Sequence, residues 1–101
     1  CQIIRKNLPS AKIIFTLSPI PLMATFRNQS CITANSVSKS ILRVSLDNVL
    51  TKYKEDNQIY YFPSYEITKD YLVDPFKDDN RHMKDENVSF IMKIFEKNYC
   101  L

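Results

Sequence analysis

The sequence has 101 residues and contains no glycine, although average usage of about 7% predicts roughly seven in a chain of this length. Walker A loops, dinucleotide-binding fingerprints and G-x-S-x-G nucleophile elbows need glycine where the backbone turns with positive φ or approaches a phosphate, so this sequence excludes all three. Its 14 Lys and Arg against 11 Asp and Glu give a net charge of +3 without a basic block, which argues against nucleic acid as a partner.

A short strand is the first predicted element, at residues 12–17 (KIIFTL). This run is apolar and β-branched, and a proline lies outside each end of it, which is typical of a fully buried strand. From residue 20 to residue 35 no hydrophobic period persists, because Pro21 and several polar residues interrupt it. We therefore expect a long loop there, with room for a short helical turn.

An amphipathic helix is predicted from Val37 to Tyr53, a segment without proline. Asn35 and Ser36 come directly before it and provide candidate N-cap side chains. Apolar residues at helical spacing form the expected core face, and polar residues occupy the opposite side of the helix. The core face comprises Leu42, Leu46, Val49, Leu50 and Tyr53.

A second strand is predicted at 59–62, where β-branched and aromatic residues follow a polar stretch. Pro63 ends this strand, because proline cannot donate to a sheet ladder. Residues 64–70 are expected to continue as an extended segment. The three aromatic residues of the strand, Tyr60, Tyr61 and Phe62, belong to the predicted core.

The last part of the chain is predicted to form a charged loop and then a helix. Residues 74–85 (DPFKDDNRHMKD) form the loop, which contains the only histidine of the chain. Asp85 and Glu86 supply an acidic first turn, which favours the amino terminus of a helix. Its expected core face comprises Val88, Ile91, Ile94 and Phe95.

The order strand, helix, strand, helix predicts an α/β fold with a parallel sheet and right-handed crossovers. In such sheets ligands bind beyond the carboxyl ends of the strands. Here this edge comprises the loop after Ser18, residues 63–85 and the amino-terminal end of the first predicted helix. A parallel sheet of two strands leaves large faces uncovered, so we expect further strands from elsewhere and interpret the 101 residues as half of one domain.

Cys1, Cys31 and Cys100 are widely spaced, and no C-x-x-C pair indicates zinc or redox chemistry. We interpret them as reduced thiols of a cytoplasmic protein, and we expect no metal and no cofactor. No apolar run approaches the roughly 18 residues of a membrane span, and the start lacks a signal-peptide layout. The sequence begins with Cys rather than Met, so we expect the natural amino terminus to lie upstream.

The clearest chemical signal is the pair Asp79 and His82 in the stretch DNRH. A carboxylate that is hydrogen-bonded to one imidazole nitrogen fixes the tautomer and frees the other nitrogen to deprotonate a serine hydroxyl. An Asp-x-x-His turn brings the two side chains together locally. The same four residues also fit a solvated histidine in a charged loop, and the motif alone leaves both interpretations open.

Four phrases in consistent order carry a resemblance to a known family. They are residues 14–21 (IFTLSPIP), 35–43 (NSVSKSILR), 61–67 (YFPSYEI) and 79–82 (DNRH). Together they resemble the carboxyl-terminal half of a GSCFA-family domain, and that family is similar to the SGNH (GDSL-like) hydrolases. The resemblance runs from about Lys12 to Phe95.

The resemblance implies a partial three-layer α/β/α sandwich and a serine ester hydrolase or acyl transferase acting on a small-molecule or glycan ester. By that analogy Asp79 orients His82, and His82 is the general base. The family's Gly-Ser-Cys-Phe-Ala phrase, with its nucleophilic serine, does not occur in these residues. The resemblance therefore implies that the nucleophile lies upstream and that this chain is inactive alone.

Three further residues are candidates for substrate binding: Asn35, Lys39 and Ser64. Asn35 either caps the helix or donates to a substrate oxygen. Lys39 and Arg43 lie four residues apart, and they either contact an anionic substrate, belong to a solvated helix flank or bond to neighbouring loops. The Ser64 hydroxyl lies near a strand end, where turn formation or capping also explains it. Glu66 is either a buried structural acid or a site residue.

The rival function is a non-catalytic α/β structural or binding module, or a truncated product without activity. An upstream reading frame that lacks a serine in a Gly-Ser-Cys-Phe-Ala-like context would favour this rival. A third hypothesis is nucleic-acid binding through the helix face of Lys39 and Arg43, which predicts steeply salt-dependent retention on DNA.

Overall fold

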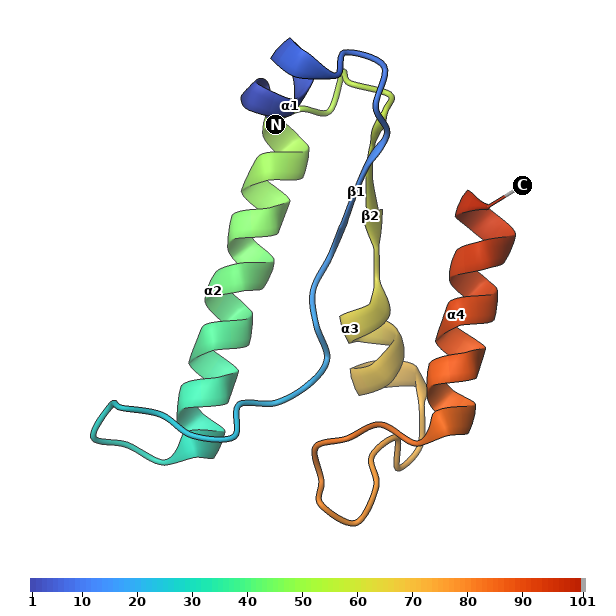
Figure 1. The fold of residues 1–101 in the computed structure, drawn as a ribbon. Helices are drawn as coiled ribbons and strands as arrows, with labels where there is room; N and C mark the ends of the chain where they lie inside the picture. Colours follow the sequence, from blue (N-terminus) through green and yellow to red (C-terminus); the bar gives the residue numbers. More distant parts are fainter. Residues whose placement is uncertain (101) are drawn as a thin grey trace.

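The computed structural model describes residues 1–100 as helices around a two-stranded parallel sheet (Figure 1). In chain order the elements are α1 (Gln2–Asn7), β1 (Ile13–Thr16), α2 (Cys31–Lys52), β2 (Ile59–Phe62), α3 (Ser64–Glu66), the π-helical segment η1 (Ile67–Tyr71) and α4 (Asp85–Tyr99). The strands pair in register from Ile13 opposite Ile59 to Thr16 opposite Phe62. The parallel pairing across an intervening helix confirms the predicted α/β class.

The helices α2 and α4 lie on opposite sides of the strands (Figure 1). Successive side chains of a strand point to opposite faces, and β2 follows this rule. The Tyr61 ring lies under the Arg43 guanidinium of α2, with 4.8 Å between the guanidinium carbon and the ring centroid. The Phe62 ring instead contacts Phe95 of α4, with 5.2 Å between centroids. The strands are therefore the middle layer of an α/β/α arrangement.

The buried core is small and centred on the carboxyl end of β2. Leu17, Ala34, Phe62 and Ile91 are its buried apolar residues. Phe62 makes edge-to-face contacts with two rings of α4, Phe95 and Tyr99, at interplanar angles of 77° and 86°. Of the three aromatic residues predicted for the core, Phe62 is buried, whereas Tyr60 and Tyr61 are half-buried.

Helix α2 begins at Cys31, six residues before the predicted start at Val37. Its N-cap is Ser30, whose Oγ accepts a hydrogen bond from the Ile32 N–H at 3.3 Å. Asn35 and Ser36, the predicted caps, lie inside the helix. The first turns of α2 were not predicted because they pack against the preceding loop and not against the sheet. Their apolar residues therefore do not repeat at helical spacing on the side that faces the sheet.

This cap predicts different effects for two serine substitutions on the same helix. Ser30→Ala removes the acceptor for an orphan N–H of the first turn and should lower the free energy of unfolding by about 1 kcal/mol. Ser36→Ala, at an exposed position inside the helix, is the matched control and should change it by less than about 0.5 kcal/mol. Urea denaturation followed by circular dichroism measures both, and equal losses would contradict the assignment of the cap.

Two residues predicted to face the core are exposed instead. Leu42 of α2 is 47% exposed and Val88 of α4 is 44% exposed. The sheet side of α2 includes Lys39, which bonds to the loop after β1, and Arg43, which bonds to Glu66 of α3. These two side chains face inward, although polar residues are expected to face solvent. The predicted apolar face of the helix was therefore placed too far round the helix, toward Leu42.

Residues 64–70 are helical rather than extended. The Thr68 Oγ1 donates to the Ser64 carbonyl at 2.9 Å, one turn earlier, and the Leu72 N–H donates to the Ile67 carbonyl at 3.0 Å. The second bond spans five residues, which is the spacing of a π-helix. Pro63 ends the strand as predicted, but the extended segment predicted after it was wrong, because local bonds such as that of Thr68 support helical turns.

The sequence analysis did not predict helix α1. Its Arg5 guanidinium bonds to both oxygens of Asp56, through Nε at 2.7 Å and Nη2 at 3.1 Å, and this pair connects α1 to the turn between α2 and β2. The hydrogen bond from Arg5, with a further one from the Gln58 N–H, holds the pKa of Asp56 below its usual value. A six-residue helix has too few turns to show a period.

The chain exposes more surface than a self-contained domain of its mass. Its accessible surface is 7682 Å², against about 5,900 Å² for a folded monomer of 11.9 kDa. Its radius of gyration is 15.8 Å, against about 13 Å for a domain of 100 residues. Exposed apolar residues on the outer helix faces, such as Ile41 and Val44, contribute to the excess. No helix in residues 1–100 combines the length and apolar character needed to cross a membrane.

Candidate active site

The loop between η1 and α4 brings Asp79 and His82 into direct contact. Asp79 Oδ2 is hydrogen-bonded to His82 Nδ1. The other carboxylate oxygen, Oδ1, accepts the backbone N–H of Arg81 at 3.0 Å and that of His82 at 2.9 Å. Asn80, between them, adopts φ of 52°, a left-handed conformation that Asn tolerates better than most residues. The Asp-x-x-His turn therefore forms the local pair that its spacing predicts.

A short backbone ladder supports this turn. Phe76 and Met83 form an antiparallel bridge, the Lys77 N–H donates to the His82 carbonyl at 2.7 Å, and the Lys84 N–H donates to the Pro75 carbonyl at 3.0 Å. The Lys84 ammonium also pairs with Asp74 at 2.6 Å. The charged loop is thus an ordered hairpin that presents Asp79 and His82 at its tip.

The hydrogen bonds at Asp79 stabilise its charged form. The bond from the His82 ring contributes most, and the two backbone N–H groups add to it, so together they lower the pKa of Asp79 to about 2. The carboxylate occupies Nδ1 of the ring, which leaves Nε2 free to take a proton from a hydroxyl. The side chains are 47% and 62% exposed, so a reacting group can reach them.

The lowered pKa predicts how the pair responds to acid. In the folded protein Asp79 should titrate near pH 2, whereas an unfolded Asp titrates near about pH 3.9. Because the folded pKa is the lower one, the contribution of the pair to stability is fully present above about pH 4 and is lost as the pH falls toward 2. Carboxyl ¹³C chemical shifts measure the midpoint, which should rise in His82→Ala. A midpoint near 4 in the unmodified protein would contradict this.

Two adjoining clefts separate the hairpin from the loop after β1 and the start of α2. One has a volume of about 490 Å³, and Asp79, Asn80 and Arg81 line it together with residues of the loop and of α2. The other, of about 430 Å³, extends toward η1. Asn35 lines both. Residues that follow β1 and residues that follow β2 both line the clefts, so the clefts lie beyond the carboxyl ends of these strands, where the topology predicts a ligand site.

Of the three predicted substrate-binding residues, the structure places Asn35 at the clefts. Its Oδ1 accepts the Leu22 N–H at 3.0 Å, so it also holds the loop against α2. Lys39 is buried, its Nζ donates to the Ser18 carbonyl at 2.6 Å, and burial lowers the pKa of its ammonium. Ser64 is buried as well and does not line either cleft. A role of each in substrate binding stays a prediction.

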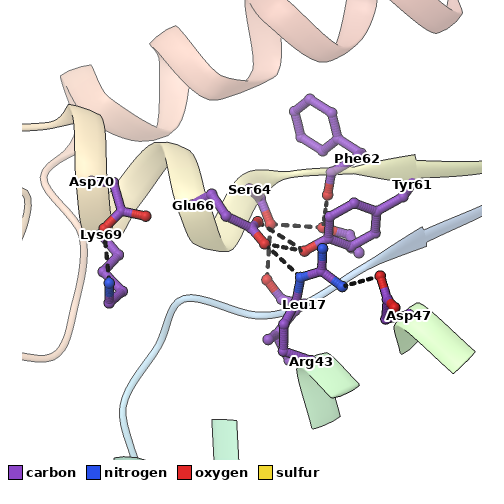
Figure 2. A network of polar contacts seen from close by, with 10 residues as sticks. Leu17, Arg43, Asp47, Tyr61, Phe62, Ser64, Glu66, Lys69 and Asp70 are labelled. Atoms are coloured by element: carbon purple, nitrogen blue, oxygen red, sulfur yellow. Dashed lines mark hydrogen bonds and ion pairs between the residues drawn. The ribbon is translucent and has the colours of Figure 1, made fainter. Parts of the chain in front are cut away.

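Ser64 connects the carboxyl ends of the two strands. Its Oγ donates to the Leu17 carbonyl at 3.0 Å (Figure 2). The same Oγ lies 2.7 Å from the Thr16 Oγ1, which donates to the Phe62 carbonyl at 2.8 Å. The Lys39 ammonium holds the next carbonyl along, that of Ser18. These bonds hold the chain where it leaves β1 toward the clefts.

Glu66 is the centre of a polar network between α2, β2 and α3 (Figure 2). Its carboxylate accepts from Arg43 Nε at 2.8 Å and from the Tyr61 hydroxyl at 2.8 and 3.0 Å. Burial, and then the hydrogen bond to Glu66, raise the pKa of Tyr61 to about 12. Glu66 is therefore a half-buried structural acid, and Arg43 bonds to its neighbours rather than forming a solvated flank.

Arg81 was not predicted as a cleft residue, because the Asp-x-x-His chemistry involves only the first and last positions of that stretch. The apolar wall that Leu22, Ile32 and Phe76 provide was not predicted either. The only available signal was the position of these residues on the loops after the strands. Among residues 1–100 no cluster of three or more His, Cys, Asp or Glu side chains has the geometry to hold a metal ion.

A family model described as the GSCFA family matches residues 1–95 of the chain. The match includes the four phrases of the resemblance, and it extends further toward the amino terminus, over helix α1. No curated protein and no solved structure matches the chain.

Proposed function

The chain belongs to the GSCFA family, and from this premise we propose that it supplies the Asp and His of a serine ester hydrolase or acyl transferase. The observation that carries the proposal is the Asp79 Oδ2 to His82 Nδ1 hydrogen bond at the tip of a hairpin beside a cleft. Asp79 has the role of orienting residue, and His82 has the role of general base. The substrate is a small-molecule or glycan ester.

In the proposed reaction, His82 Nε2 takes the proton of a serine hydroxyl while the serine oxygen bonds to the ester carbonyl carbon. The charged imidazolium is stabilised by the Asp79 carboxylate, whose lowered pKa keeps it ionised. His82 then gives the proton to the alcohol oxygen as the carbon–oxygen bond breaks. Water or a second alcohol attacks the acyl-serine in the same way, which gives hydrolysis or transfer.

The nucleophile in this proposal is a serine outside these 101 residues. No Gly-Ser-Cys-Phe-Ala phrase occurs in the chain, and the chain has no glycine for the turn that presents such a serine. We place these residues in the carboxyl-terminal part of a single domain. The open sheet edges and the excess of exposed surface are where the rest of that domain would pack.

The test is saturable hydrolysis of 4-nitrophenyl butyrate by the complete gene product, combined with labelling by a fluorophosphonate. We expect turnover above the buffer rate and one labelled serine, identified by peptide mass spectrometry, outside the present residues. If neither turnover nor labelling occurs, the rival interpretation of a non-catalytic α/β module replaces this one.

A further inference from the structure

Arg81 is a cleft residue for which the fold supplies no partner. Its Nε is shielded from solvent and has no hydrogen-bond partner, and within residues 1–100 its guanidinium forms no ion pair. The side chain as a whole is half-buried. An N–H group of a cation that is removed from water without a partner is costly, because it loses hydration and gains nothing in return.

Other cations that are removed from solvent in this chain do have partners. Arg5 pairs with Asp56, Arg43 with Glu66, Lys84 with Asp74, and Lys39 donates to the Ser18 carbonyl. The nearby carboxylate of Asp79 does not pair with Arg81, because its oxygens accept hydrogen bonds from the His82 ring and from two backbone N–H groups. Among these partly buried cations, Arg81 is therefore the exception.

The surroundings of Arg81 fit a bound anion. The cleft of about 490 Å³ that it lines is walled mainly by apolar side chains, among them Leu22, Met23, Ile32 and Phe76. The planar guanidinium matches the two oxygens of a carboxylate. Asp79 lines the same cleft, whereas His82, which contacts Asp79 and follows Arg81 in the chain, does not line it.

From this arrangement we infer that Arg81 binds a carboxylate of the substrate, so that the site takes esters with an anionic acyl or alcohol part. The ester bond of the substrate rests on the proposed function, whereas the binding of an anion at Arg81 does not. In this proposal the carboxylate accepts from the outer nitrogens of the guanidinium, on the side of Arg81 that lines the cleft. His82 follows it directly in the chain and acts on the ester bond.

The decisive experiment measures binding without turnover. Succinamate, which carries one carboxylate and an amide in place of the ester, is titrated into the complete gene product and compared with neutral succinamide by NMR and calorimetry. We expect saturable binding of the anion that shifts the Arg81 Nε–Hε resonance, and about 10–100-fold weaker binding in Arg81→Gln. Arg81→Lys should retain part of the affinity. Arg27→Gln, at an exposed position outside this cleft, is the matched control and should bind as the unmodified protein does.

Failure of this inference and failure of the proposed function give different results. Equal binding by Arg81→Gln, or no preference for the anion, overturns the carboxylate site whether or not esters are cleaved. Binding that depends on Arg81 supports the site even if no ester is hydrolysed. If the protein turns over esters, two further substrates show on which side the carboxylate binds. 4-Nitrophenyl hemisuccinate carries it on the acyl side, and 4-carboxyphenyl butyrate carries it on the alcohol side. Arg81→Gln should lower kcat/KM for the one whose carboxylate meets Arg81 and should leave kcat/KM for 4-nitrophenyl butyrate unchanged.

Discussion

His82→Ala should reduce kcat/KM for 4-nitrophenyl butyrate by about 10²–10⁴-fold in the complete gene product, because the general base is lost while the cleft persists. His82 is the only histidine of the chain, so no second imidazole of these residues replaces it. Its ring makes one hydrogen bond, to the exposed Asp79, and for that reason the substitution should leave the fold intact. Steady-state kinetics and circular dichroism measure the two effects.

A pair of neighbouring acids provides the control for this result. Asp79→Asn removes the charge that stabilises the imidazolium and should also lower kcat strongly. Asp78→Asn changes the same charge one residue earlier, at an exposed position outside the His82 contact, and should leave kcat/KM within about twofold. Full activity in His82→Ala, or equal losses in the two Asp variants, would refute the assignment of the pair.

Phe62→Ala should lower the free energy of unfolding by about 3–5 kcal/mol. Phe62 is 6% exposed and contacts two aromatic rings of α4, so its removal leaves a cavity between the sheet and that helix. Since small domains have a total stability of about 5–15 kcal/mol, such a loss brings the protein close to unfolding at 25 °C. Urea denaturation followed by circular dichroism and by tyrosine fluorescence measures the change.

The matched control is Phe26→Ala, the same substitution at a side chain that is 111% exposed. It should change the free energy of unfolding by less than about 0.5 kcal/mol, because no packing is lost. A Phe62 variant as stable as the Phe26 variant would mean that the contacts of Phe62 with α4 do not hold the two layers together.

Features that depend on neighbouring residues were predictable from the sequence. The run at residues 12–17 is β-branched and bounded by prolines, and the strand formed there at Ile13–Thr16. The acidic turn at Asp85 marks the actual start of α4. The Asp79 to His82 contact was predictable as well, since four consecutive residues contain both partners and the turn between them.

Features that depend on distant partners were not predictable. Lys39 faces inward because the Ser18 carbonyl, 21 residues earlier, is within reach of its ammonium, and no periodicity contains that information. Arg43 likewise finds Glu66, 23 residues later. The cleft at Arg81 lies between the hairpin and the loop around Leu22, which bonds to α2, and the sequence indicated only that both segments follow strands.

The hairpin that carries Asp79 and His82 also bears on the order of folding. Every backbone bond that shapes its tip joins residues within 75–84, and a loop of about ten residues closes in about 10–100 ns. The side-chain bond from Thr16 to the Phe62 carbonyl, by contrast, closes a separation of 46 residues and costs more chain entropy. The hairpin can therefore reach its native geometry before the strands pair. The bonds that arrange Asp79 and His82 are all local, and none of them includes a residue of β1 or β2.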